Sequence, residues 1–79
     1  MKHTYIIITI TYFGNSYMKP MVHYYRRCGA VEESTFDELT VDEANRKMWE
    51  LVKLGGKNIY ESNWFDNSIS TRQVIYRRH

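Results

Sequence analysis

The stretch TVDEANRKMWELVKLG, residues 40–55, decides the fold because it carries the start, the apolar stripe and the end of one amphipathic helix. Thr40 and Glu43 have the spacing of a capping box, in which each side chain binds a backbone N–H at the helix start. Gly55 supplies the left-handed residue that commonly ends a helix. Apolar side chains fall within one arc about 100° wide: Val41, Ala44, Met48, Leu51 and Val52, with Trp49 at its edge. The helix is therefore expected to bury one stripe against other elements.

The length and composition indicate one small folded domain over residues 1–79. Apolar residues make up 43% and aromatic residues 15% of the chain, which is too rich in large side chains for a disordered protein. The net charge of +2 does not by itself favour a class of partner. The single cysteine, Cys28, excludes an intramolecular disulfide and fits a reducing compartment. We therefore expect a cytoplasmic protein.

The apolar run at residues 5–13 is interpreted as a strand rather than as a signal peptide or a membrane span. A transmembrane helix needs about 20 residues, and this run is far shorter. It contains Thr9 and Thr11, and turn residues follow it instead of a small-residue cleavage site. Its β-branched residues favour a strand. No membrane partner is expected.

Four segments have strand character, at residues 4–13, 18–27, 57–65 and 69–77. Pro20 cannot donate a ladder hydrogen bond, so the second strand is expected to lie at an edge or to begin after the proline. Residues 29–39 are interpreted as a connection, with one helical turn at residues 34–37. The predicted fold is α+β, a single small domain of ββαββ order with a four-stranded antiparallel sheet and one helix packed on one face.

One helix of about 14 residues is roughly 21 Å long, so it can cover only one side of such a sheet. The strands do not alternate cleanly between apolar and polar residues. In the first strand Ile6, Ile8 and Ile10 point one way, and Tyr5, Ile7 and Phe13 point the other. Large side chains are therefore expected on the open side, unless a bulge, a bent sheet or the 29–39 segment covers them. An exposed aromatic patch usually marks an interaction site.

The first candidate use of this surface is nucleic-acid binding, because aromatic rings on an open sheet stack bases while arginines hold phosphates. The second and fourth strands both end in basic pairs, which predicts a positive margin of the sheet, whereas residues 29–43 are acidic without a base. A plainer interpretation is that the charges keep sheet edges from pairing with other chains. The candidate nucleic-acid-binding residues are Tyr25, Arg26, Arg27, Arg72, Tyr76, Arg77 and Arg78.

The alternative use is protein association, by homodimerisation or by capture of another protein through the same open sheet face. Small domains often supplement a thin core by association. Tyr60 and Trp64 are the candidate interface residues, together with neighbouring isoleucines. Nucleic acid and a protein, including a second copy of the chain, are therefore the two candidate partners.

The sequence shows no catalytic pattern, so a non-catalytic binding module is expected. His3, His23 and His79 are scattered and have no metal-ligand spacing with Cys28. The carboxylates crowd into residues 32–43 without a nearby histidine for acid–base catalysis. We expect no cofactor, no metal and no small-molecule substrate.

Overall fold

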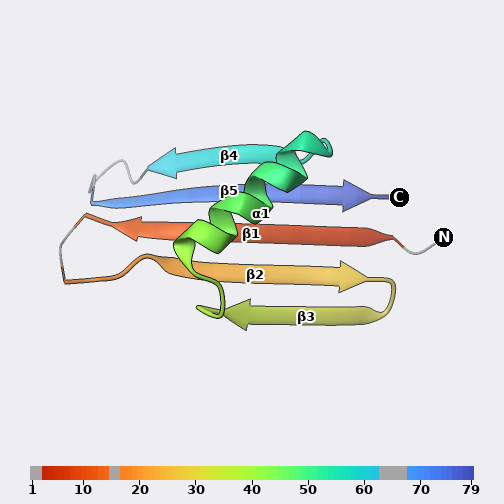
Figure 1. The fold of residues 1–79 in the computed structure, drawn as a ribbon, viewed down its shortest axis with the longest axis horizontal. Coiled ribbons are helices and arrows are strands. Elements are labelled where there is room, and N and C mark those ends of the chain that lie inside the picture. The colour runs from red at the N-terminus through yellow and green to blue at the C-terminus, as the bar shows by residue number, and fades with distance from the viewer. Residues whose placement is uncertain (1–2, 15–16, 63–67) are drawn as a thin grey trace.

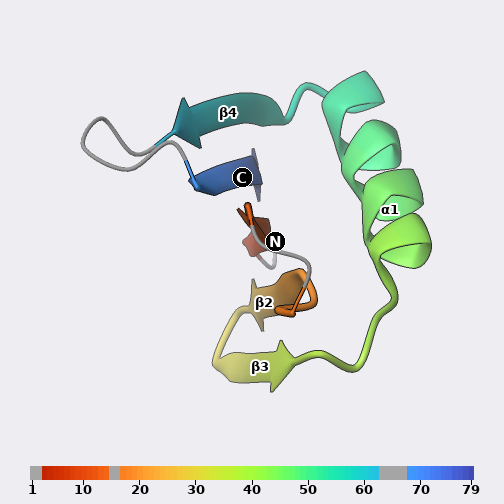
Figure 2. The same cartoon turned by 90° about the vertical axis from the view of Figure 1, so that its left-hand side faces the viewer.

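The computed structural model describes residues 3–14, 17–62 and 68–79. Within these residues it contains five strands and one helix in the order βββαββ. Their bounds are β1 Thr4–Phe13, β2 Met21–Cys28, β3 Val31–Phe36, α1 Val41–Lys53, β4 Lys57–Ser62 and β5 Ile69–Arg78. The strands form one sheet, and α1 lies along one side of it (Figure 1, Figure 2). The predicted α+β class is confirmed.

The sheet is antiparallel throughout, with the strand order β3-β2-β1-β5-β4. β1 is therefore the central strand, although it comes first in the sequence. Because β2 and β5 both run antiparallel to β1, they finish at the same end of the sheet, where β1 begins (Figure 1). The first and last strands of the sequence thus lie side by side.

The prediction of four strands is wrong, because residues 29–39 are more than a connection. Val31–Phe36 forms β3, an outer strand that pairs with β2. A two-residue loop joins the two strands, and its first residue, Gly29, has the left-handed φ of 61° that such tight hairpins favour. The predicted helical turn is also absent from this segment. Asp37 instead closes the hairpin, since its N–H donates to the Val22 carbonyl at 2.8 Å and its Oδ1 accepts from the Val22 N–H at 2.9 Å.

The other strand predictions hold with shifted ends. β2 begins at Met21, directly after Pro20, and it is not an edge strand because β3 pairs with its outer side. β4 ends at Ser62, and the predicted extension to residue 65 lies outside the described residues. β5 continues to Arg78, one residue further than predicted.

Both ends of α1 form as the sequence predicts. The Thr40 hydroxyl accepts from the Glu43 N–H at 3.2 Å, and the Glu43 carboxylate accepts from the Thr40 N–H at 3.3 Å. At the other end Gly55 has a φ of 101°, and the N–H groups of Gly55 and Gly56 donate to carbonyls of the last helical turn. This pair of bonds is a Schellman motif. No helix within the described ranges has the length and apolar character to span a membrane.

The core lies between α1 and the face of the sheet that the helix covers. Its buried side chains are Ile8, Ile10, Val22, Ala44, Met48, Leu51 and Val74. Three of them come from the predicted stripe of the helix, and two further members of that stripe, Val41 and Val52, pack against the core from its margin. Trp49 stands at the edge of the stripe, as predicted, and is 56% exposed.

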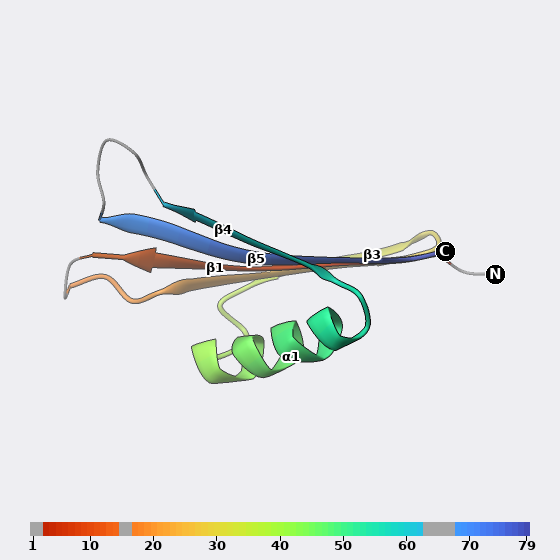
Figure 3. The same cartoon turned by 90° about the horizontal axis from the view of Figure 1, so that it is seen from above.

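The opposite face of the sheet, called the open face below, is not covered by a helix of the described residues (Figure 3). Alternate residues of each strand form it, and in β1 these are Tyr5, Ile7, Thr9, Thr11 and Phe13. Five of its apolar residues are half-buried: Ile7, Phe13, Ile59, Ile69 and Ile75. Met21 and Phe36 are 45% and 63% exposed. Large apolar side chains therefore remain on the side that the helix leaves open, as its limited area predicts.

Candidate nucleic-acid interface

The sheet projects beyond α1 at the end where β1 begins. A strand of ten residues is about 33 Å long, whereas a helix of 13 residues is about 20 Å long. The strands continue past the C-terminal end of α1 on the side where β2 and β5 finish (Figure 1, Figure 3). Basic side chains gather there, and this group is called the basic end: His3, Arg26, Arg27, Arg77, Arg78 and His79.

A row of three side chains crosses the open face at the basic end. Tyr5 of β1 lies opposite Arg27 of β2 on one side and opposite Arg77 of β5 on the other. Residues directly opposite in antiparallel strands have Cβ atoms about 4.5–5.5 Å apart, close enough for their side chains to interact. The guanidinium carbon of Arg77 lies 5.1 Å from the centroid of the Tyr5 ring, within the range of a cation–π contact. The ring is thus flanked by an arginine on each neighbouring strand.

A second aromatic ring, that of Tyr25, extends the row along the open face. It meets Tyr5 edge to face, with ring centroids 6.0 Å apart and an interplanar angle of 73°. The Tyr25 hydroxyl donates to Oε1 of Glu32 at 2.8 Å. This hydrogen bond, with smaller contributions from burial and from the Glu32 charge, raises the pKa of Tyr25 above its ordinary value of 10.0. The phenol is therefore neutral and held in place at physiological pH.

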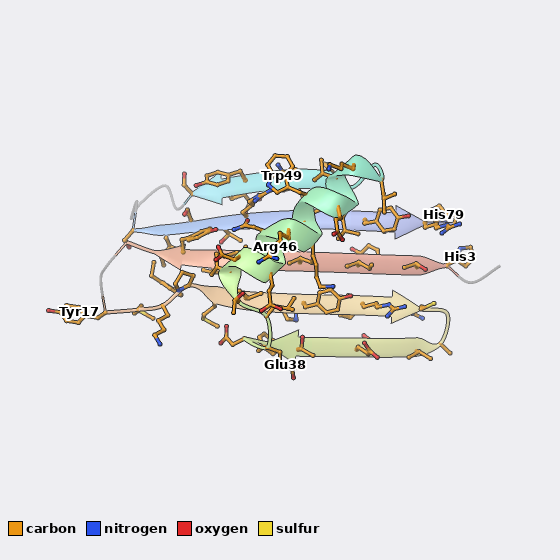
Figure 4. The ribbon with its side chains drawn as sticks, viewed as in Figure 1. His3, Tyr17, Glu38, Arg46, Trp49 and His79 are labelled. Carbon is orange, nitrogen blue, oxygen red and sulfur yellow. The ribbon has the colours of Figure 1, made fainter. Side chains whose placement is uncertain are left out.

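These side chains line a shallow hollow of about 600 Å³. Its lining residues are His3, Thr4, Tyr5, Tyr25, Arg27, Gly29, Arg77 and His79. The rings of His3 and His79 lie together at the basic end, edge to face with centroids 5.5 Å apart (Figure 4). Nε of Arg27 donates to the Gly29 carbonyl at 3.3 Å, which orients its guanidinium group. The hollow offers aromatic rings beside cationic N–H donors, a combination that suits an anionic ligand with flat rings.

The seven residues predicted to bind nucleic acid do not share one surface. Three of them line the hollow: Tyr25, Arg27 and Arg77. Three others point to the face that carries α1, because their partners in β1 are residues of that face: Arg26, Tyr76 and Arg78. Of these, Tyr76 packs against the core. The open-face members therefore define the candidate site.

The seventh residue, Arg72, lies between the helix and the sheet. Its Nη1 donates to Oδ1 of Asn45 at 2.6 Å, and its Nε donates to Oδ1 of Asn58 at 3.5 Å. Its guanidinium carbon lies 5.2 Å from the centroid of the Trp49 ring. Its Nη2 is buried with no hydrogen-bond partner among the described residues. Arg72 thus ties α1 to β4 and β5, away from the open face.

Of the two residues predicted for a protein interface, only Tyr60 is among the described residues. Tyr60 is 70% exposed and belongs to β4, an outer strand. It lies on the face that carries α1, since its partner in β5 is Arg72, and not on the open face. Trp64 lies outside the described residues.

Five residues that line the hollow were not predicted from the sequence: His3, Thr4, Tyr5, Gly29 and His79. The alternation of the first strand placed Tyr5 on the open side, but the pairing of β1 with both β2 and β5 was needed to bring arginines to it. The two histidines look scattered in the sequence and meet only because β1 begins where β5 ends. Knowledge of the strand order was the missing signal.

The site shows no metal-binding character within the described ranges, because no group of three or more His, Cys, Asp or Glu residues is placed to hold an ion. The half-buried thiol of Cys28 is free, and the Thr4 hydroxyl lies 4.0 Å from its Sγ.

The chain was compared with protein families, curated proteins and solved structures. No family model, no curated protein and no solved structure matches it. Its class is therefore defined by its own fold: a small α+β domain of one antiparallel sheet and one helix.

Proposed function

We propose that this protein is a non-catalytic module that binds single-stranded nucleic acid at the basic end of its open face. The row Arg27–Tyr5–Arg77 carries the proposal, because it sets one aromatic ring between arginines on the two neighbouring strands. Single strands present both groups that this row recognises, since unpaired bases stack on aromatic rings and phosphates pair with arginine. In a duplex the base faces are stacked inside the helix, so only its phosphates could bind, to the arginines.

The neighbouring side chains support the same ligand. Tyr25 offers a second ring that stays neutral at physiological pH, so it does not repel a phosphate. Ile7 and Ile75 lie opposite each other in the next part of the open face and are half-buried, which gives an apolar floor for bases or sugars. Aromatic and apolar contacts of this kind tolerate many base sequences.

The charge pattern predicts modest and salt-sensitive affinity. Glu32 lies opposite Arg27 in the β2–β3 pair and opposes part of its positive potential. With two phosphates held by Arg27 and Arg77, the logarithm of the binding constant should fall against the logarithm of salt concentration with a slope of about −1.4. Contacts from Arg26 or Arg78 around the sheet end would make the slope steeper.

Fluorescence anisotropy tests the proposal with labelled oligothymidylate and oligouridylate of about 20 nucleotides and a duplex of equal length, at about 20 and about 200 mM salt. We expect tighter binding of the single strands, and weaker binding at the higher salt. Arg77→Glu should weaken binding of the single strands at least about tenfold at low salt, because it removes one phosphate contact and adds a repulsive charge.

The matched control is Arg46→Glu, the same charge reversal on the exposed side of α1 (Figure 4). It should leave most of the affinity in place. No binding of either single strand at low salt would contradict the proposal. Equal losses in the two variants would show attraction by net charge without a site at the basic end.

A further inference from the structure

β4 leaves one edge of the sheet without a partner strand in the part of the chain that the structure describes. It pairs with β5 on one side only, and five of its six residues are exposed. An unpaired edge offers a row of free backbone N–H and C=O groups to which another strand can add. β3 forms the other free edge, so the two edges have to be compared.

The two edges differ in whether they suit a second copy of the same chain. When a strand pairs antiparallel with its own copy, a two-fold axis relates the two strands. In an antiparallel pair, residues directly opposite each other point to the same face of the sheet. This is possible here only if one residue lies opposite the same residue of the other copy, and that residue is the centre of the pair. A β4 pair centred on Ile59 sets Lys57 of each copy opposite Glu61 of the other, so two opposite-charge pairs form. It also sets Asn58 opposite Tyr60 on the face that carries α1.

The β3 edge lacks this complementarity. Its sequence VEESTF contains Glu32 and Glu33 and no basic residue. Two copies paired through β3 would therefore line up four carboxylates along one seam, with no basic residue contributed by either β3 strand. Charged side chains along an edge are a common means of preventing such pairing, and like charges that face each other across the seam repel.

Exposed aromatic side chains accompany the β4 edge. Tyr60 is 70% exposed and Trp49 is 56% exposed, both on the side of the sheet that carries α1. The Trp49 side chain lies over β4 (Figure 4). A strand added to β4 would lie beside Tyr60 and close to Trp49, so their exposed area would be reduced by the added chain.

We infer that a second copy of this chain adds along β4 in the register centred on Ile59, so that two five-stranded sheets become one ten-stranded sheet with both helices on the same side. The basic ends then lie at opposite ends of the joined sheet, and both open faces stay accessible. This assembly is separate from nucleic-acid binding and stands without it.

The test measures mass by light scattering or sedimentation over a range of protein concentrations. The wild-type protein should approach about 19 kDa, twice the 9.5 kDa of one chain. Lys57→Glu turns both charge pairs into Glu–Glu pairs, and Glu61→Lys turns both into Lys–Lys pairs. Each variant should weaken the dimer roughly tenfold or more, because like charges directly opposite are repulsive.

The register is tested by mixing the two variants. In a mixed dimer the two substituted side chains face each other with opposite charges, and the unchanged Lys57 of one chain faces the unchanged Glu61 of the other. The mixture should therefore recover the dimer mass that each variant alone has lost. Arg46→Glu on α1 is the matched charge-reversal control and should leave the wild-type mass unchanged.

Three outcomes would overturn the inference. They are a wild-type protein that is monomeric at every concentration, a dimer that neither single variant weakens, and two folded variants whose mixture stays monomeric. If circular dichroism shows that a single variant is unfolded, the mass of the double variant Lys57→Glu/Glu61→Lys tests the register instead. It restores both opposite-charge pairs and must dimerise, and a folded monomeric double variant would refute the register.

Discussion

The guanidinium carbon of Arg77 lies 5.1 Å from the centre of the Tyr5 ring, although the two residues come from opposite ends of the sequence. The pairing of β1 with β5 creates this contact, because β1 begins where β5 ends. At an exposed site a cation–π contact contributes only about 0.5–1 kcal/mol to stability. A second arginine, Arg27, flanks the same ring from β2, which concentrates positive charge on the open face. The proposed nucleic-acid binding rests on this pair of arginines beside one aromatic ring.

Replacing Tyr5 with Leu should weaken binding of a single-stranded oligonucleotide by about 1–3 kcal/mol, or roughly five- to 150-fold, because a base loses its stacking partner. Tyr5→Phe keeps the aromatic face and should bind nearly as well as the wild type. Anisotropy titrations at low salt measure both affinities. Equal affinities of the Leu and Phe variants would show that no base stacks on this ring.

Replacing Glu32 with Gln should strengthen binding a few-fold at low salt, because it removes a negative charge beside Arg27. The gain should shrink as salt is added. Glu50→Gln removes the same charge from the exposed side of α1 and serves as the control. A Glu32→Gln variant that binds no better than the control would place the phosphates away from Arg27.

The hydrogen bond from Tyr25 to Glu32 predicts a pH dependence on the alkaline side. Since the pKa of Tyr25 is higher in the folded protein than its ordinary 10.0, the bond stabilises the fold below about pH 10, and this stabilisation is lost as pH rises through the raised pKa. NMR titration of labelled tyrosine rings should show Tyr25 titrating above 10.0, and closer to it in Glu32→Ala. An unchanged titration in that variant would mean that the bond does not form in solution.

Replacing Arg72 with Gln should lower the free energy of unfolding by about 1–3 kcal/mol, because a charge-assisted hydrogen bond to Asn45 is lost. The cation–π contact with Trp49 is lost as well. Urea denaturation measures this change, and oligonucleotide affinity of the folded variant should stay close to that of the wild type. A folded Arg72→Gln protein with strongly reduced affinity would move the binding surface toward α1.

Replacing Met48 with Ala should destabilise the protein by about 2–5 kcal/mol, because a fully buried side chain leaves a cavity between α1 and the sheet. This is a large share of the stability of a small domain. Leu54→Ala, at a side chain that is 66% exposed, should change stability by about 0.5 kcal/mol or less. Similar urea midpoints for the two variants would contradict the packing of α1 described above.

The helix was predictable because its signals are local. The capping box of Thr40 and Glu43, the apolar stripe and the closing Gly55 all lie within 40–55, and each is found in the structure. The first strand was also predictable, because its isoleucines and threonines are β-branched residues, which favour strands.

β3 was missed because an outer strand does not need an apolar face. Its residues 31–34 are all exposed, and Glu32 and Glu33 resemble a solvated loop when the sequence is read alone. The hydrogen-bond ladder with β2 and the tight turn at Gly29 make it a strand, and neither follows from its own hydrophobic pattern. Tertiary pairing here overrides local propensity.

The candidate site was only partly predictable for a related reason. The basic pairs at the ends of β2 and β5 were visible in the sequence, and the strand directions bring them to one end of the sheet. Tyr5 joins them only through the order β2-β1-β5, which depends on long-range pairing. Alternation along each strand then separates Arg27 and Arg77 from Arg26 and Arg78, so four similar residues divide between two faces.

An NMR titration of the isotope-labelled protein with a short oligothymidylate at low salt tests binding at the basic end most directly. We predict saturable shifts of the backbone amide signals of Tyr5, Tyr25, Arg27 and Arg77, reversed by added salt, with the signals of α1 unchanged. Shifts confined to α1 or to the β4 edge, or no shifts at all, would contradict the proposed interface.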